Sequence, residues 1–188
     1  MLNICTVVAS ELDLKFNIKK SMAPRIGSRY KRNCSNLLLD GKVLQFVPEI
    51  KYLGVFVQSG SYLRCSFNHT KIQFYRSFNA IFTKAKSGSS EIICINLLKA
   101  YCLPLLLYAT EAISPGQREI KTLDKLIDRA FSKIFNSFDP NIISTMRAVF
   151  GLESLCSLVY ARRSGFIASL LSKQLYFVKC LHSCSSYK

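Results

Sequence analysis

The sequence predicts an α+β protein in which an N-terminal helix and a small antiparallel sheet precede an all-α helical region. Two observations lead to this class. Asp40-Gly41 stands between two apolar runs, which is a strong hairpin signal because both residues tolerate positive φ. From residue 66 onward, apolar residues instead recur every three or four positions, the period of a helix. Strands followed by a run of helices are typical of α+β proteins.

The first sixty residues predict one helix and three short strands. Leu2, Cys5, Leu12 and Phe16 share one helical stripe, which predicts a helix over residues 2–16. No capping signal precedes this helix, so we expect the reading frame to begin inside an element. The Asp-Gly turn joins strands within residues 36–47. Residues 51–58 are rich in β-branched and aromatic side chains and predict a third strand.

The helical region opens with two predicted helices. Ile72, Tyr75, Phe78, Phe82 and Ala85 form the apolar stripe of the first, with Lys71 and Arg76 off that line. The second, over residues 91–113, is apolar nearly all round and is therefore expected to be central. Pro104 is expected to kink it near Tyr101, because proline removes a backbone hydrogen bond.

Three further helices follow. Ser114 is expected to cap one, with Pro115 at its first helical position and an apolar stripe from Leu123 to Phe138. Asp139-Pro140 repeats the cap-plus-proline signal for a short helix that ends at Gly151. The last helix is expected over residues 152–172.

The charge of the chain predicts a polyanionic partner. Lys and Arg number 26 against 11 acidic residues, for a net charge of +15, and this excess favours nucleic acid over a membrane surface. Residues 15–32 contain seven basic side chains and no acid: Lys15, Lys19, Lys20, Arg25, Arg29, Lys31 and Arg32. They form either a solvated basic loop or an edge that contacts phosphates. Lys71 and Arg76 would add contacts from the helix over residues 68–86.

Metal, membrane and secretory signals are weak. Eight cysteines form no CxxC pair, and the N-terminus does not resemble a signal peptide, which predicts reduced thiols in an intracellular protein, nuclear or cytoplasmic. The longest apolar run, residues 100–110, is too short to cross a bilayer, so no membrane association is expected. Cys180, His182 and Cys184 offer at most three ligands, and no metal site is predicted.

The residues predict no catalytic site. Asp124 and Asp128 lie four positions apart among basic residues, which favours a solvated helix face over a metal site. There is no Asp-Asp pair and no glycine-rich phosphate loop. His69 and His182 belong to no nucleophilic motif. By its own chemistry the chain is not expected to be an enzyme.

Three stretches in a fixed order resemble the reverse transcriptases of non-LTR (LINE-type) retrotransposons. Residues 12–21 resemble the segment after the catalytic Tyr-x-Asp-Asp loop, with an Asn-x-x-Lys-Ser ending. Residues 41–57 hold an Asp-Gly hairpin before Tyr52-Leu53-Gly54. Residues 101–111 are similar to a thumb helix with a Pro-x-Leu-Leu-Tyr-x-x-Glu run. The resemblance covers about residues 2–135.

The resemblance implies a palm remnant over residues 1–62, a helical thumb-like region over residues 63–173 and a tail over residues 174–188. It implies an RNA and DNA template–primer as partner, with Lys51, Tyr52 and Gly54 near the primer end. Lys19 or Lys20 would lie near the phosphates of the incoming nucleotide. The alternative for Lys20 is a phosphate or solvent contact after a helix.

The resemblance also implies a missing part. The family uses Mg²⁺ held by carboxylates, which would lie before residue 1 together with the fingers, so we expect no cofactor in this chain and no polymerase activity by it alone. The missing palm and fingers would be a further partner. Two other interpretations stay open: a free-standing basic helical nucleic-acid-binding protein, and a structural or protein-interaction domain.

Overall fold

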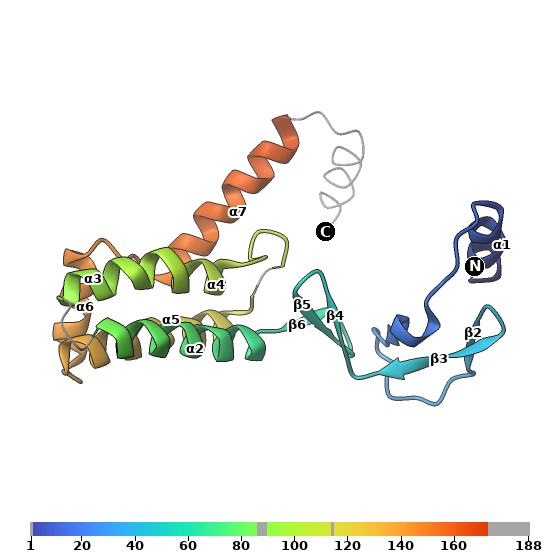
Figure 1. The fold of residues 1–188 in the computed structure, drawn as a ribbon, viewed down its shortest axis with the longest axis horizontal. Coiled ribbons are helices and arrows are strands. Elements are labelled where there is room, and N and C mark those ends of the chain that lie inside the picture. The colour runs from blue at the N-terminus through green and yellow to red at the C-terminus, as the bar shows by residue number, and fades with distance from the viewer. Residues whose placement is uncertain (1, 86–89, 114, 173–188) are drawn as a thin grey trace. The chain divides into compact units, whose positions relative to one another are not determined.

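The structure, a computed structural model, describes residues 2–85, 90–113 and 115–172 (Figure 1). The chain forms two compact units, residues 1–67 and 68–188. Among the described residues, strands occur in the first unit and the second unit is helical, which confirms the predicted α+β class. Strand β6 (Arg64–Ser66) pairs with β5 and so keeps residues 64–66 within the first unit.

The first sheet contains the predicted Asp-Gly hairpin. Strands β2 (Leu37–Leu39) and β3 (Lys42–Val47) are antiparallel, and Asp40 and Gly41 have φ of 53° and 70° at the turn between them. Both values are positive, as this tight turn requires. Strand β1 (Met22–Pro24) joins β3 in parallel, which makes the sheet mixed rather than antiparallel. A three-residue strand carries too little periodicity to be predicted.

The second sheet corrects the strand predicted over residues 51–58. Strands β4 (Glu49–Tyr52) and β5 (Val55–Gln58) form an antiparallel hairpin, and β6 adds a third strand beside β5. The chain reverses at Leu53-Gly54, whose φ values are 46° and 80°. The single-strand prediction was wrong because leucine rarely occupies the left-handed region, so the sequence does not indicate a turn there.

The N-terminal helix is shorter than expected. Helix α1 (Leu2–Glu11) ends well before Phe16, and Asp13 has a positive φ of 54° just beyond it. None of its residues is buried, and Ile4 and Val7 on its surface are exposed. A 3₁₀ turn, η1 (Ile18–Lys20), follows in the segment that leads to β1.

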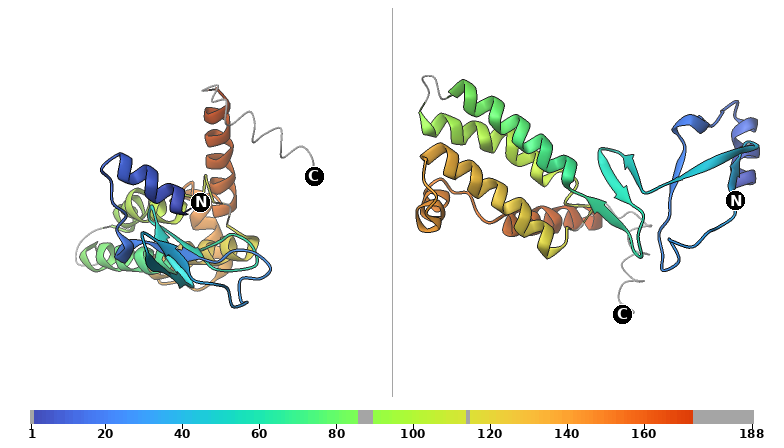
Figure 2. Two further views of the ribbon diagram at one scale, coloured as in Figure 1. Left: turned by 90° about the vertical axis from the view of Figure 1, so that its right-hand side faces the viewer. Right: turned by 90° about the horizontal axis from the view of Figure 1, so that it is seen from below.

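The second unit, the helical part of the chain in Figure 2, holds the main apolar core. Its elements are α2 (Asn68–Ala85), α3 (Glu91–Leu97), the π-helical segment η2 (Leu98–Cys102), α4 (Leu103–Leu107), α5 (Gln117–Phe135), α6 (Pro140–Val149) and α7 (Leu155–Ser172). Phe74, Phe131 and Ile95 are among the largest fully buried side chains. Ile72, which the stripe placed inward, is 48% exposed, whereas Phe74 on α2 is buried.

Just before Pro104, where the sequence predicts a kink, the helix changes type. The helix widens into η2, where the N–H of Leu103 donates to the carbonyl of Leu98, five residues earlier. Such a segment accommodates the missing N–H and the bulky ring of proline. Tyr108 then adopts an extended conformation, so α4 ends at Leu107 rather than near residue 113.

The helix starts agree with one of the two predicted cap-plus-proline signals. The Asp139 carboxylate accepts the N–H of Asn141 at 2.8 Å, which confirms the cap of α6. Gly116, rather than Ser114, is the N-cap of α5, and Glu119 Oε2 accepts the Gly116 N–H at 2.6 Å. Ser114 itself lies outside the described residues.

The other helix limits differ from the prediction by a few residues. Phe138, expected at the end of the α5 stripe, lies beyond that helix and is 85% exposed. Helix α7 begins at Leu155 rather than residue 152. The predicted tail over residues 174–188, with Cys180, His182 and Cys184, falls outside the described part of the chain. None of the described helices is long and apolar enough to span a membrane.

Candidate nucleic-acid interface

The segment after β1, residues 25–34, is called the basic loop and is held in a defined shape. Its start is fixed to the segment after β5, because the Arg25 N–H donates to Ser59 Oγ at 2.9 Å and the Gly60 N–H donates to the Arg25 carbonyl at 3.0 Å. The Gly27 N–H donates in turn to the Gly60 carbonyl at 2.8 Å. Gly27 has φ of 131°, a conformation open to glycine. The loop is therefore anchored at its base.

Arg25 closes this loop on itself. Its Nη1 donates to the Arg32 carbonyl at 2.6 Å, and its guanidinium lies 5.2 Å from the centre of the Phe46 ring. The sequence placed Arg25 among phosphate-contacting residues, whereas the structure engages it in holding the two ends of the loop together. The charge of Arg25 is retained, since all of these partners are neutral.

An open hollow of about 750 Å³ lies along this loop and has no acidic residue in its lining. Arg25, Arg29 and Arg32 line it together with small and polar residues: Gly27, Ser28, Tyr30, Asn33 and Cys34. Lys31 lies outside the lining, with its ammonium 5.6 Å from the Tyr30 ring centre. The structure thus brings together three of the seven predicted basic residues around one concave surface.

The remaining basic residues of the segment precede β1. Lys15 lies in the stretch after α1, and Lys19 and Lys20 form the last turn of η1. All three are exposed. Their positions fit the prediction of a basic surface, but they do not line the hollow of the loop.

The Tyr-Leu-Gly motif forms the tip of the β4–β5 hairpin. Tyr52 is 66% exposed and Leu53 is 75% exposed, and Gly54 completes the turn. The Lys51 ammonium lies 5.6 Å from the Phe56 ring centre, across the same pair of strands. A leucine held at positive φ and left largely exposed is a strained, apolar tip.

Lys71 and Arg76 lie on α2 in the second unit. Lys71 Nζ is 3.4 Å from Asn68 Oδ1, and Arg76 is exposed. They therefore belong to a separate unit from the basic loop and the hairpin.

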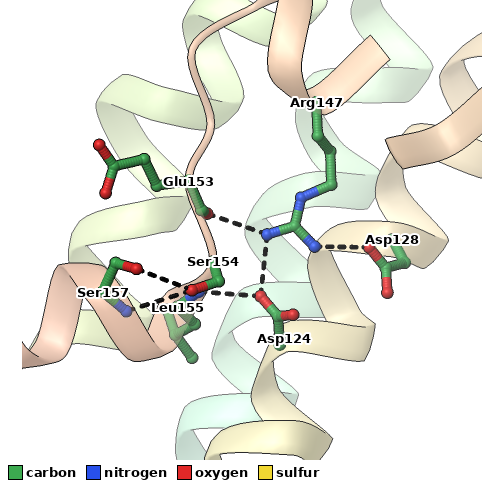
Figure 3. Close-up of polar contacts among 7 residues, drawn as sticks. All are labelled: Asp124, Asp128, Arg147, Glu153, Ser154, Leu155 and Ser157. Atoms are coloured by element: carbon green, nitrogen blue, oxygen red, sulfur yellow. Dashed lines mark hydrogen bonds and ion pairs between the residues drawn. The ribbon is translucent and has the colours of Figure 1, made fainter. Parts of the chain in front are cut away.

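A buried arginine of the second unit carries polar chemistry that the sequence interpretation missed (Figure 3). Arg147 of α6 donates from Nη1 to Asp128 at 2.6 Å and from Nη2 to Asp124 at 2.9 Å, and also to the Glu153 carbonyl at 3.0 Å. The Leu155 N–H, at the start of α7, donates to Asp124 Oδ1 at 3.0 Å. The cluster joins α5, α6 and α7.

This cluster corrects the interpretation of Asp124 and Asp128 as a solvated face. Burial lowers the pKa of Arg147, but the two carboxylates outweigh it, and the pKa is raised. A pocket of about 610 Å³ lies beside the cluster. The sequence offers one signal for this cluster: Asp124 and Asp128 are one helical turn apart, and Arg147 lies between apolar residues of the next helix. The cluster ties α5 and α6 to the start of α7.

In the part of the chain that the structure describes, no three or more His, Cys, Asp or Glu side chains form a group that could hold a metal ion.

Comparison with known proteins leaves the family open. No protein-family model, no curated protein and no solved structure matches this chain.

Proposed function

We propose that this chain binds a nucleic-acid template–primer as a palm-and-thumb part of a non-LTR retrotransposon reverse transcriptase. The motif order over residues 12–21, 41–57 and 101–111 supports the family. The observation that carries nucleic-acid binding is the anchored loop, whose hollow is lined by three arginines and no acid. Arginine presents planar donors that suit phosphate oxygens, and a preformed loop lowers the ordering cost of binding them.

The exposed tip of the β4–β5 hairpin supports a contact with the primer end in this proposal. Tyr52 and Leu53 present apolar surface at a rigid two-residue turn. An aromatic ring at such a tip can stack on a base or sugar, while Lys51 beside it supplies charge. The family resemblance assigns this hairpin to the primer end.

The apolar surface of the first unit suggests a protein partner in the same proposal. Ile4, Val7 and Val8 on α1 and Leu38 and Val43 on the first sheet are exposed. Exposed apolar residues in this density indicate surfaces that pack on another protein part. Under the proposal, that part is the palm and fingers of the full enzyme, which would also supply the carboxylates that hold Mg²⁺.

The proposal is tested by binding to a recessed RNA–DNA hybrid. Wild-type chain should bind a 20-base-pair hybrid with a template overhang more tightly than the same hybrid with blunt ends. Neutralising the loop with Arg29→Gln, Lys31→Gln and Arg32→Gln should weaken both, because three phosphate contacts are lost. The charge-preserving control Arg29→Lys, Lys31→Arg and Arg32→Lys should bind far more tightly than the neutral variant.

The same measurement separates the alternative. A free-standing basic helical nucleic-acid-binding protein, supported by the net charge of +15, would bind blunt and recessed duplexes equally. Tyr52→Ala should then leave affinity unchanged, whereas under the template–primer proposal it should remove the preference for the recessed end.

A further inference from the structure

We propose that α5 carries a second phosphate-binding surface, a basic stripe that follows the backbone of a nucleic-acid duplex. The stripe consists of Arg118, Lys121, Lys125, Arg129 and Lys133. It rests on the proposed function and extends it, because it locates duplex contacts on a helix that the sequence analysis did not assign to binding.

The spacing places the five cations on one helix face. Residues three or four positions apart lie above one another on a helix, and these five follow that spacing throughout. From first to last they cover about 22 Å, since each residue rises by about 1.5 Å. All five are exposed, while Leu123, Ile127 and Phe131 bury the opposite side in the core.

Helix α2 positions the C-terminal half of the stripe. Arg129 Nη1 donates to the Tyr75 hydroxyl at 3.0 Å, and Lys133 Nζ donates to Asn79 Oδ1 at 3.0 Å. The Lys133 ammonium also lies 5.0 Å from the Phe82 ring centre. The two helices run in the same direction, because the pair Lys133–Asn79 lies one turn further along both helices than the pair Arg129–Tyr75.

These contacts orient the charges without cancelling them. Tyrosine, asparagine and phenylalanine are neutral, so Arg129 and Lys133 keep their positive charge. The hydrogen bond that Arg129 donates to the Tyr75 hydroxyl raises the pKa of Arg129. Two fixed cations on a seam between helices lose less side-chain entropy on binding an anion than free ones do.

The acids near the stripe are occupied elsewhere. Asp124 and Asp128 hold Arg147, and Glu119 accepts the Gly116 N–H. Glu91 lines a small pocket beside Lys133 at the end of the stripe. Among the described residues, no member of the stripe forms an ion pair with a carboxylate.

The stripe differs from an ordinary solvated helix face because the two aspartates beside it, Asp124 and Asp128, pair with Arg147 and not with the stripe lysines. Such faces usually mix Glu with Lys at four-residue spacing, because these pairs stabilise the helix by about 0.2–0.5 kcal/mol each. Five cations in line instead repel one another, and a row of phosphates relieves that repulsion. The stripe therefore fits a polyanion that extends along the helix.

The test compares three variants of the full chain by fluorescence anisotropy with the recessed RNA–DNA hybrid over a range of KCl. The first removes three stripe charges with Arg118→Gln, Lys121→Gln and Lys125→Gln, leaving the two residues tied to α2. The second keeps the charge with Arg118→Lys, Lys121→Arg and Lys125→Arg. The third removes three charges outside the stripe with Lys173→Gln, Lys179→Gln and Lys188→Gln.

The expected result is specific to the stripe. Three lost phosphate contacts lower the slope of log affinity against log salt by about 2.7, so over a fourfold rise in KCl the wild type should lose about 40-fold more affinity than the neutral stripe variant. The charge-preserving variant should match the wild type, and the variant outside the stripe should change less. As a check on the unaltered chain, the hybrid should protect Lys121 and Lys125 from acetylation.

Two outcomes would overturn the inference. If the neutral stripe variant keeps the slope of the wild type, or if Lys121 and Lys125 stay fully reactive in the complex, α5 does not contact the duplex, although the proposed function stands through the loop. If the wild-type chain does not bind the hybrid at all, both proposals fail. Circular dichroism of each variant confirms that helix content is unchanged.

Discussion

At the scale of single residues, Arg147 shows how the second unit holds three helices together. Its guanidinium donates hydrogen bonds to two carboxylates and one backbone carbonyl, which lie in different directions. Removing one partner of a buried charged cluster leaves the others desolvated and uncompensated. Arg147 therefore contributes to the packing of α5, α6 and α7 in the second unit.

Arg147→Met should lower the free energy of unfolding by about 2–4 kcal/mol, because Asp124 and Asp128 lose their counterion inside a partly buried cluster. Urea denaturation followed by circular dichroism measures this change. Lys125→Met, on the exposed face of α5 beside Asp124 and Asp128, is the matched control and should change stability by less than about 0.5 kcal/mol. Equal effects of the two substitutions would show that the cluster contributes nothing beyond surface charge.

Cys102 gives a prediction for pH. Burial, with a smaller contribution from Cys94, raises the pKa of this thiol from its ordinary value of 9.0 to about 11. The folded state thus favours the protonated thiol. Its contribution to stability is fully present below pH 9, where the unfolded thiol is also protonated, and is lost as the pH rises towards 11.

We expect the stability difference between wild type and Cys102→Ala to shrink between pH 9 and pH 10.5. At pH 8, Cys102 in the native chain should also resist alkylation, while the exposed Cys5, Cys34 and Cys156 react. Urea denaturation and mass spectrometry of alkylated peptides measure the two effects. Rapid labelling of Cys102 under native conditions would contradict its burial.

At the scale of elements, the β4–β5 hairpin carries local strain at its tip. Leu53 has φ of 46°, in a region that costs a non-glycine residue about 1–2 kcal/mol, while asparagine tolerates it. Leu53→Asn should therefore raise the free energy of unfolding by about 0.5–1 kcal/mol. Thermal and urea denaturation of the variant measure this gain.

Gly54→Ala provides the opposite case in the same turn. Gly54 has φ of 80°, so a methyl group added at this position is strained and should destabilise the chain by about 1 kcal/mol. If Leu53→Asn were instead destabilising, the two-residue turn would not be the native conformation of the Tyr-Leu-Gly motif.

The elements that the sequence predicted well have a strong local cause. The Asp40-Gly41 turn and the Asp139 cap depend on residues whose own chemistry fixes the backbone, and both are present as expected. The turn at Leu53 was missed because leucine rarely adopts a positive φ, and the shift of the α2 stripe to Phe74 was missed because packing decides which face of α2 is buried. Strand β1 depends on pairing with β3, a partner some twenty residues away.

The candidate site followed the same division. The distribution of charge alone predicted the basic segment over residues 15–32. In the structure, Arg25, Arg29 and Arg32 of this segment lie around one hollow. The structural role of Arg25 could not be predicted, because its acceptor is a backbone carbonyl seven residues away. The spacing of Asp124 and Asp128 hinted at a shared partner, but Arg147 could not be identified as that partner, since only the folded chain brings the three helices together.

At the scale of the whole molecule, the two units differ in how much they bury. In the first unit, Leu39, Leu44 and Cys65 are the buried apolar residues among those described, whereas the second unit has a continuous helical core. The first unit also holds the basic loop and the hairpin tip. Under the proposed function, binding of nucleic acid and of the palm and fingers to this weakly cored unit would add to its stability.

The most direct measurement is the affinity of the wild-type chain for the recessed RNA–DNA hybrid between 50 and 200 mM KCl. Three contacts from the loop and three from the α5 stripe predict a slope of roughly −5 for log affinity against log salt, or about a thousandfold loss over this range. An affinity that stays constant across these salt concentrations, or no binding at 50 mM, would contradict a template–primer role for this chain.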